Sequence, residues 1–475
     1  DGYSVEPCER EGAGTDVILT LKKDTEEEKY SEYLSEYRLR SLVRKYSDYI
    51  RYPIRMEVET SRPTEETKDS DKPEYETVRE MQTLNSMVPV WQKNKKDVTE
   101  EEYDTFYREK FYDFTKPLRV IHTSVEGAVS FKALLFVPGK APYDFYSKDF
   151  KRGLQLYSSG VMIMENCEDL LPEHFRFVRG IVDSQDLSLN ISREMLQHTR
   201  ELKFIAGNLE KKIKAELEKM LENDREKYEK FYAAFGRQLK FGVVSEFGAH
   251  KELLQDLIEF YSVKEGKLVT LKEYCAAMPE SQKHIYFATG SSVEHLTRLP
   301  QTGMLRDRGF DVLLLTEQVD EFIPQTLQKY EFRNILTDDL ELATDEEKKA
   351  NEERAESFKD TLTFMKDTLG EKVKEVRVSG DLGTHAVTMV PDGGMSFEME
   401  KYFHALDPKS DYHCGRILEV NAEHPLLKRL QASVADNAEM AKKLTELLYV
   451  QGLLMANLPL EDPTAYTDLV CELIG

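Results

Sequence analysis

The sequence has little cysteine and no long apolar run. Its five cysteines, none in a CxxC pair, are Cys8, Cys167, Cys275, Cys414 and Cys471. This pattern predicts neither a disulfide framework nor a zinc site, and it favours a reducing, cytoplasmic location. No stretch approaches the roughly 18 apolar residues of a membrane-spanning helix. No signal peptide is visible either.

Positively charged residues are outnumbered by negatively charged ones. The chain has 65 Lys and Arg against 88 Asp and Glu, which gives a formal net charge of −23. An overall basic surface is therefore missing, and nucleic acid is excluded as the principal partner.

The common nucleotide and metal motifs are absent. The sequence contains no GxxxxGK[ST], no Rossmann glycine pattern after a strand and no HExxH. His284, His385, His404 and His413 are scattered and are interpreted as structural. Cys167 has no accompanying histidine signature, so we do not expect it to be a nucleophile. Taken alone, the chain is not expected to be a self-sufficient enzyme.

With 475 residues, the chain is too long for one core, and two to four domains are expected. It begins with Asp rather than Met, and we expect a fragment that starts within a domain and is without its N-terminal part. Residues 16–22 and 54–58 read as strands around a helix at 30–50. A charged, Pro-containing linker should follow at 59–80.

The sequence that follows this linker predicts alternating strands and helices. A first α/β layer has a helix at 97–112, strands within 118–137 and 153–164, a strand ending at Asp183 and a long helix from Ser192. A smaller α/β unit should span 241–335, with buried strands at 285–288 and 312–315 and helices at 292–299 and 317–330. Beyond it we expect a highly charged helix or linker at 343–359, strands at 374–378 and 386–390, and helices at 395–406, 435–455 and 463–474. The fold class is multidomain α/β and α+β, ending in helices.

The most informative segment is IVDSQDLSLNISREMLQ, at 181–197. Arg193 falls in the first turn of the predicted helix, where the helix dipole opposes a cation. Its guanidinium is therefore expected to reach outward to an anion, with the Gln197 amide on the same face. A surface ion pair is the alternative, and the residues alone favour it.

Three apolar features allow two interpretations each. Met395, Met399, Tyr402 and Phe403 form one helical face, which suits either varied apolar partners or an ordinary core. Trp91, the only tryptophan, is either a surface anchor or a core residue. The terminal helices either pack within the chain or, as we favour, pair with a second copy. The expected dimer residues are Leu444, Leu447, Leu448, Leu454, Leu469 and Leu473.

Several segments together resemble one family. SLNISREMLQ (188–197) closely resembles the catalytic-loop signature of the heat-shock protein 90 chaperones, and so do LNSMVPVWQKNKKDVTEEEYDTFY (84–107), FVRGIVDSQDL (177–187) and FDVLLLTEQVDEF (310–322). The match runs in the expected order through nearly the whole chain. The short linker and the end at Gly475 resemble the bacterial HtpG type.

The resemblance implies a domain order and a set of functional residues. It implies a nucleotide-domain remnant at 1–58, a linker at 59–83, large and small middle subdomains at 84–240 and 241–335, and a dimerisation domain at 336–475. Thr15 would help to line the adenine pocket, Arg193 would reach the γ-phosphate of ATP, and Gln197 would support it. Client proteins would contact Trp91, the acidic-aromatic pair Glu321 and Phe322, and the face of Met395, Met399, Tyr402 and Phe403.

The resemblance also implies cofactors and partners. ATP with Mg²⁺ would act in the full-length protein, while no nucleotide or metal is expected on this fragment, which lacks most of the ATPase domain. The implied partners are a second copy, partly folded clients and a bacterial heat-shock protein 70 system, with no nucleic acid and no membrane. A passive dimeric scaffold is the competing class. A related phosphotransferase would need a phosphoacceptor His in a helical hairpin, and no His occurs in such a pattern.

Overall fold

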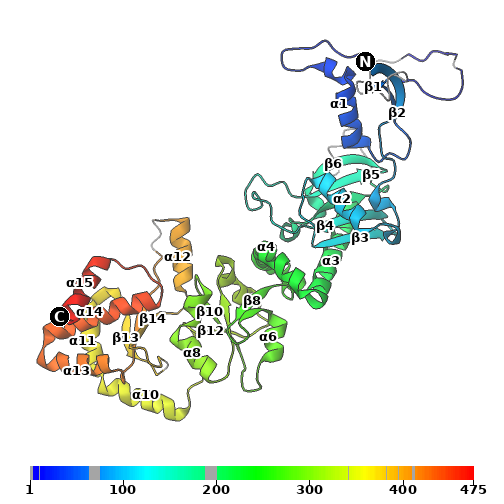
Figure 1. Ribbon diagram of the computed structural model, residues 1–475. Coiled ribbons are helices and arrows are strands. Elements are labelled where there is room, and N and C mark those ends of the chain that lie inside the picture. Colours follow the sequence, from blue (N-terminus) through cyan, green and yellow to red (C-terminus); the bar gives the residue numbers. More distant parts are fainter. Residues whose placement is uncertain are drawn as a thin grey trace. The chain divides into compact units, whose positions relative to one another are not determined.

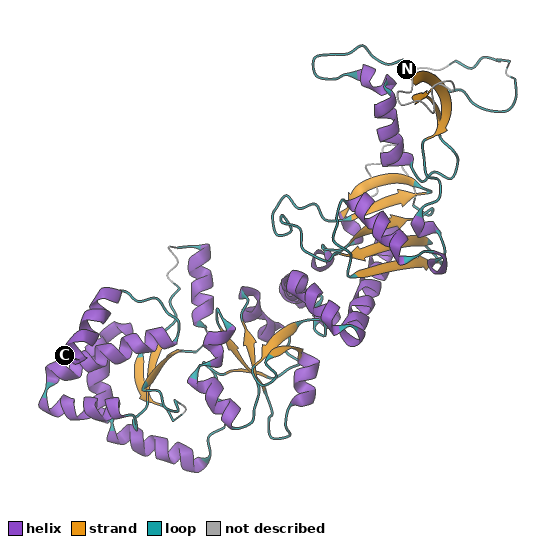
Figure 2. Cartoon of the chain, in the orientation of Figure 1, coloured by secondary structure: helices purple, strands orange, loops and turns teal. Residues whose placement is uncertain are grey.

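The computed structural model describes residues 4–9, 11–63, 75–187, 200–340, 342–380, 382–393, 395–408 and 412–474 (Figure 1). The chain divides into two compact units. The first unit comprises 1–138, 146–171 and 178–209, and the second comprises 139–145, 172–177 and 210–475. Helices and strands alternate through both units (Figure 2), so the predicted multidomain α/β fold class is confirmed. Among the described residues, no helix is both long and apolar enough to cross a membrane.

The first unit opens with a helical segment and a β-ladder. The helix expected at 30–50 is confirmed. It consists of three successive helical stretches, η1 (Tyr30–Leu34), α1 (Glu36–Leu42) and η2 (Val43–Ser47). Strands β1 (Arg55–Pro63) and β2 (Tyr75–Thr83) pair antiparallel, from Arg55 opposite Thr83 to Pro63 opposite Tyr75. Much of the segment read as a linker is therefore regular strand. Apolar content is low there because, apart from Val58, the described side chains of the ladder are exposed or half-buried.

The strand predicted at 16–22 is wrong. These residues form no regular element, and Val17, Ile18 and Leu19 are exposed. A strand needs a partner for its backbone N–H and C=O groups, and the segment pairs with none among the described residues.

A mixed five-stranded sheet forms the core of the first unit, in the order β3-β4-β7-β5-β6. Its strands are β3 (Arg119–Val125), β4 (Phe131–Val137), β5 (Leu154–Ser158), β6 (Val161–Cys167) and β7 (Arg179–Asp183). Helix α2 (Glu100–Phe111) begins with a capping box between Thr99 and Glu102. It packs Phe106 and Tyr107 against Phe136 of β4. The hairpin and helix expected from the sequence are confirmed.

Two long helices follow, α3 (Arg200–Asn223) and α4 (Arg225–Val244), separated by Asp224, which caps α4. The predicted apolar stripe of α3 is confirmed, because all six of its described positions are buried: Leu202, Ile205, Leu209, Ile213, Leu217 and Met220. Short turns flank this pair, namely η6 (Glu173–Phe175), η7 (Ser245–Gly248) and α5 (Lys251–Leu254).

The second unit contains a second five-stranded sheet, in the order β12-β10-β11-β8-β9. Strand β10 (Ile285–Thr289) pairs parallel with β11 (Val312–Leu315), as the sequence predicted. It also pairs parallel with β12 (Phe332–Asn334), which was not predicted. The hairpin of β8 (Glu259–Ser262) and β9 (Lys267–Thr270), with β8 antiparallel to β11, was not foreseen. Helices α6 (Leu271–Ala277), α7 (Val293–Thr297) and α8 (Pro300–Asp307) connect the strands.

The long helix predicted at 317–330 is instead two short turns, η8 (Gln318–Phe322) and α9 (Ile323–Thr326). Pro324 lies at the start of α9, where its missing N–H is tolerated. Leu327 leaves the helical region and ends α9.

The C-terminal part of the second unit is a small sheet covered by helices. Central β15 (Arg416–Val420) pairs parallel with β13 (Glu375–Val378) and antiparallel with β14 (Val387–Pro391). The helices are α10 (Asp345–Ser357), α11 (Lys359–Leu369), α12 (Phe397–Leu406), α13 (Pro425–Asp436), α14 (Ala438–Met455) and α15 (Pro463–Ile474). Strand β15 and helices α11 and α13 were not predicted, whereas the other elements were.

Candidate functional site: the α12–η8 surface

Helix α12 presents two different faces. Ser396 caps it by accepting a hydrogen bond from the N–H of Met399 at 3.0 Å. Phe397 and Glu400 are buried beneath the helix. Met399, Tyr402 and Phe403 are half-buried on the remaining surface. The apolar face predicted for this helix is therefore partly covered and partly open to solvent.

Turn η8 lies beside α12 in the same unit. The ring of Phe322 meets the ring of Tyr402 edge-on, with centroids 6.1 Å apart and planes at 77°. Aromatic pairs of this geometry are stabilising beyond their buried area. We call the surface formed by Glu321, Phe322, Met395, Met399, Tyr402 and Phe403 the α12–η8 surface.

A buried ion pair fixes the turn that carries Glu321 and Phe322. Asp320 has no exposed surface, and its Oδ1 lies 2.9 Å from Nζ of Lys240 on α4. The other oxygen of Asp320 accepts the backbone N–H of Glu317 at 3.1 Å. Nζ of Lys240 also lies 4.7 Å from the ring centroid of Phe260. The two residues after Asp320 are therefore set by a rigid contact with a long helix.

Glu321 and Met399 line two adjoining hollows of this surface. The larger, of about 660 Å³, also includes Phe287, Phe332 and Met395. The smaller, of about 240 Å³, also includes Lys401 and Tyr402. Burial raises the pKa of Glu321, while the neighbouring hydroxyls of Thr289 and Ser396 oppose the rise.

This arrangement is chemically suited to a partly unfolded polypeptide. Methionine and aromatic side chains adapt to apolar groups of varied shape. A half-buried carboxyl between them accepts, or when protonated donates, hydrogen bonds to a peptide backbone. The structure brings five predicted residues together here, Glu321, Phe322, Met395, Met399 and Tyr402, and the ring of Phe403 adjoins them with its centroid 5.8 Å from that of Tyr402.

Trp91 does not belong to any exposed surface. It is fully buried, and its Nε1 donates a hydrogen bond to Oδ2 of Asp183 at 3.0 Å. The rings of Tyr49 and Tyr157 pack against it, with centroids at 4.5 and 5.2 Å. The surface-anchor interpretation of Trp91 is wrong, and core packing is the observed alternative.

The expected dimer residues divide into two groups. Leu444 and Leu448 are buried in the core of their own chain, so their assignment to an intermolecular interface is wrong. Leu447, Leu469 and Leu473 are half-buried, and Leu454 is 47% exposed. Helical spacing identified the apolar face of α14 but not which half of that face the chain itself covers.

Of the expected nucleotide-site residues, the structure describes only Thr15. Arg193 and Gln197 lie outside the described residues. Thr15 is exposed on a stretch without regular structure. The described residues around Thr15 do not by themselves enclose an adenine base, so no step of ATP hydrolysis is derived from them.

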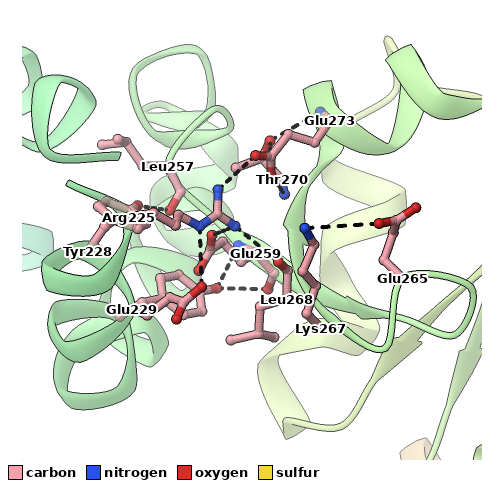
Figure 3. A network of polar contacts seen from close by, with 11 residues as sticks. Arg225, Tyr228, Glu229, Leu257, Glu259, Glu265, Lys267, Leu268, Thr270 and Glu273 are labelled. Carbon is pink, nitrogen blue, oxygen red and sulfur yellow. Dashed lines mark hydrogen bonds and ion pairs between the residues drawn. The ribbon is translucent and has the colours of Figure 1, made fainter. Parts of the chain in front are cut away.

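Sequence reasoning missed the charged contacts that hold α4 in place. At the start of α4, Arg225 contacts Glu259 of β8 at 2.5 Å and Glu273 of α6 at 2.7 Å, and it donates to the carbonyl of Leu268 at 3.0 Å (Figure 3). Both Arg225 and Lys240 stand in a helix rich in charged residues. No local pattern distinguishes these two cations from their solvated neighbours.

Comparison with known proteins gives one consistent result. The family model described as "Hsp90 protein" matches residues 57–475. The protein named "Chaperone protein HtpG" of Bacillus subtilis (strain 168) is 50% identical over 477 residues, which cover all of this chain and 76% of that protein. The protein of the same name from Clostridium acetobutylicum is also 50% identical, with the same coverage. That from Alkaliphilus metalliredigens (strain QYMF) is 49% identical over 478 residues.

Proposed function

Because the chain belongs to the heat-shock protein 90 family, we propose that it acts in an ATP-dependent molecular chaperone that binds and remodels partly folded client proteins. The observation that carries the residue-level proposal is the α12–η8 surface. There, methionine and aromatic side chains from two elements gather around a half-buried carboxyl group. Exposed apolar surface of this kind is typical of a protein-binding site.

The test is suppression of aggregation. A heat-unfolded reporter enzyme is incubated with the chain or with a Met399→Asp, Phe403→Asp double variant, and light scattering is followed. A charge on each side of Tyr402 should weaken contact with apolar segments, so the double variant should suppress aggregation less than the original chain.

A matched control separates this surface from apolar surface in general. Phe114 is 83% exposed and belongs to the first unit. A Phe114→Asp variant should suppress aggregation as well as the original chain. Equal suppression by the double variant, with folding verified by circular dichroism, would remove α12 from the proposal. It would also favour the competing class, a passive dimeric scaffold, if the original chain proved inactive as well.

We further propose that Arg193 and Gln197 serve ATP hydrolysis in the full-length protein, with Thr15 contributing to the adenine site and Mg²⁺ accompanying the nucleotide. A guanidinium stabilises the charge that develops on a transferring phosphoryl group. In the full-length protein, Arg193→Ala should lower the ATPase rate at least about tenfold. Arg200→Ala is the control, because Arg200 is exposed at the first position of α3. A wild-type rate in the Arg193 variant would refute this role.

Assembly is the last element of the proposal. A second copy pairs through the terminal helices, using Leu447, Leu454, Leu469 and Leu473, and closure of the resulting clamp is driven by nucleotide. The domain boundaries at residues 59, 84, 241 and 336 remain part of this proposal. So do a cytoplasmic location and cooperation with a heat-shock protein 70 system.

A further inference from the structure

Two histidines and one glutamate meet away from the α12–η8 surface. They are His174 on η6, Glu210 on α3 and His250 directly before α5. Oε1 of Glu210 lies 3.1 Å from Nε2 of His174 and 3.5 Å from Nδ1 of His250. One ligand-type atom from each residue falls within 4.8 Å of the other two. All three residues belong to the second compact unit.

These spacings are close to those of a metal-binding triad. Zinc binds imidazole nitrogen and carboxylate oxygen at about 2.0–2.2 Å, and a tetrahedral arrangement then places two ligand atoms about 3.3 Å apart. Both distances to Glu210 Oε1 lie within a few tenths of an ångström of that value. Two imidazoles with one carboxylate are also a ligand set that zinc uses in proteins, with a water molecule in the fourth position.

Two of the three groups favour the protonation state that a metal needs. Burial lowers the pKa of His174, which favours the neutral imidazole. Contact with His174 lowers the pKa of Glu210, which favours the carboxylate. Nε2 of His174 and Oε1 of Glu210 are both buried and lie 3.1 Å apart. A cation between them would satisfy two buried polar atoms at once.

The surroundings hold this triad in position. A Cβ on Gly242 of α4 would lie only 2.4 Å from the Cβ of His174, so glycine permits the close approach of α4. Oε2 of Glu246 lies 3.8 Å from Nε2, the other ring nitrogen of His250. A carboxylate next to that nitrogen can orient the ring of a ligand histidine and raise its basicity. The side chain of His250 is 28% exposed, so the triad borders the surface there.

We propose that His174, Glu210 and His250 form a binding site for a divalent transition-metal ion, with Zn²⁺ the best-suited occupant. The bound ion links η6, α3 and the start of α5, three elements far apart in the sequence. This site is independent of the proposed chaperone function. The ion would stabilise the region in which the long helices α3 and α4 meet η7 and α5.

A second cluster of the same residue types is less suited to a cation. Glu400, His404 and His413 also lie near one another. However, the guanidinium of Arg416 lies 4.0 Å from Glu400, and the side chain of His413 is 70% exposed. A fixed positive charge at that distance opposes a metal ion. The triad around Glu210 is therefore the stronger site.

Calorimetric titration of the chelator-stripped chain with ZnCl₂ tests the proposal. The original chain should bind Zn²⁺ with a Kd of about 1 µM or lower, and Glu210→Gln and His250→Gln should each weaken this binding at least tenfold, since losing even an outer partner of a ligand typically costs about 10–100-fold. His284→Gln is the matched control, because His284 also contacts a carboxylate, at 3.1 Å from Glu331, but belongs to no triad. It should bind Zn²⁺ like the original chain.

Two further measurements make the outcome decisive. Zn²⁺ should raise the thermal unfolding midpoint of the original chain and of His404→Gln, but not that of Glu210→Gln, because a ligand that binds only the folded state stabilises it. Circular dichroism verifies that each variant is folded before titration. The proposal would be overturned if Glu210→Gln and His250→Gln bound Zn²⁺ with unchanged affinity. It would also be overturned if the original chain bound no Zn²⁺ at a Zn²⁺ concentration 100-fold above the expected Kd.

Discussion

Nη2 of Arg225 lies 2.5 Å from Oε1 of Glu259, a carboxylate without exposed surface. The same guanidinium contacts Glu273 at 2.7 Å and Glu229 at 3.6 Å. One positive charge thus faces three carboxyl groups. Burial, together with the charges of the other two carboxylates, raises the pKa of Glu259 to about 7, although Arg225 opposes the rise.

This contact predicts a pH dependence of stability. The pKa of Glu259 is higher in the folded chain than in the unfolded one, so the folded state binds more protons between about pH 4.5 and 7. The contribution of Glu259 to stability should be fully present below about pH 4.5 and should decline as the pH rises through 7, by up to about 3 kcal/mol. Glu259→Gln should remove this decline.

Amide hydrogen exchange of strand β8 measures the effect locally, in the presence of a chelator. From pH 5 to pH 8, the exchange protection of β8 in the original chain should fall relative to that in Glu259→Gln. A difference that stays constant with pH would show that Glu259 remains ionised throughout.

The Lys240–Asp320 pair predicts a strong dependence on both partners. Lys240→Met leaves the fully buried Asp320 without its cation, which should destabilise the second unit by about 4 kcal/mol. The double variant Lys240→Met, Asp320→Asn should recover part of that loss, because no unpaired charge remains. Urea unfolding followed by far-ultraviolet circular dichroism provides the measurement. Additive losses in the double variant would contradict the coupling.

Trp91 should matter for stability and not for client binding. Trp91→Phe removes the N–H that donates to buried Asp183, which should cost about 2 kcal/mol. Gln92 continues to donate to the same oxygen at 2.8 Å. Urea unfolding should therefore shift to lower concentration, while suppression of aggregation stays at the original level. Loss of suppression in a well-folded Trp91→Phe variant would contradict the assignment of Trp91 to the core.

The exposed half of α14 predicts where a dimer can be weakened. Leu454→Asp should weaken self-association about tenfold or more, as truncation of a central interface residue does. Sedimentation velocity over a range of concentrations measures the change. Leu34→Asp is the control, because Leu34 is 75% exposed in the first unit. Equal association of both variants would exclude Leu454 from the interface.

Periodic patterns predicted elements well but not their partners. The six buried positions of α3 follow directly from helical spacing, and the parallel strands β10 and β11 follow from two short apolar runs. The same kind of reasoning placed a strand at 16–22 and could not decide the environment of Trp91. An isolated strand or a lone tryptophan is defined by residues distant in sequence, here Tyr49 and Asp183 for Trp91.

The α12–η8 surface was predicted more completely than the charged contacts beneath it. Helical spacing placed Met395, Met399, Tyr402 and Phe403 on one face. Glu321 and Phe322 were identified through resemblance to a family, which carries information on distant residues that spacing alone does not. The pairing of Lys240 with Asp320 depends on the packing of α4 against η8, which no segment of the sequence specifies by itself. The triad of His174, Glu210 and His250 was missed for the same reason, since its members come from three separate elements.

Because Leu444 and Leu448 are already covered by their own chain, the C-terminal part of the molecule does not depend on a neighbour for its interior. Separation of the two copies in the proposed dimer would uncover the partly exposed leucines of α14 and α15. Assembly and disassembly of that dimer would then be reversible events between folded subunits, and newly made chains could mature singly before they meet. Exchange of subunits between such dimers would therefore require no unfolding step.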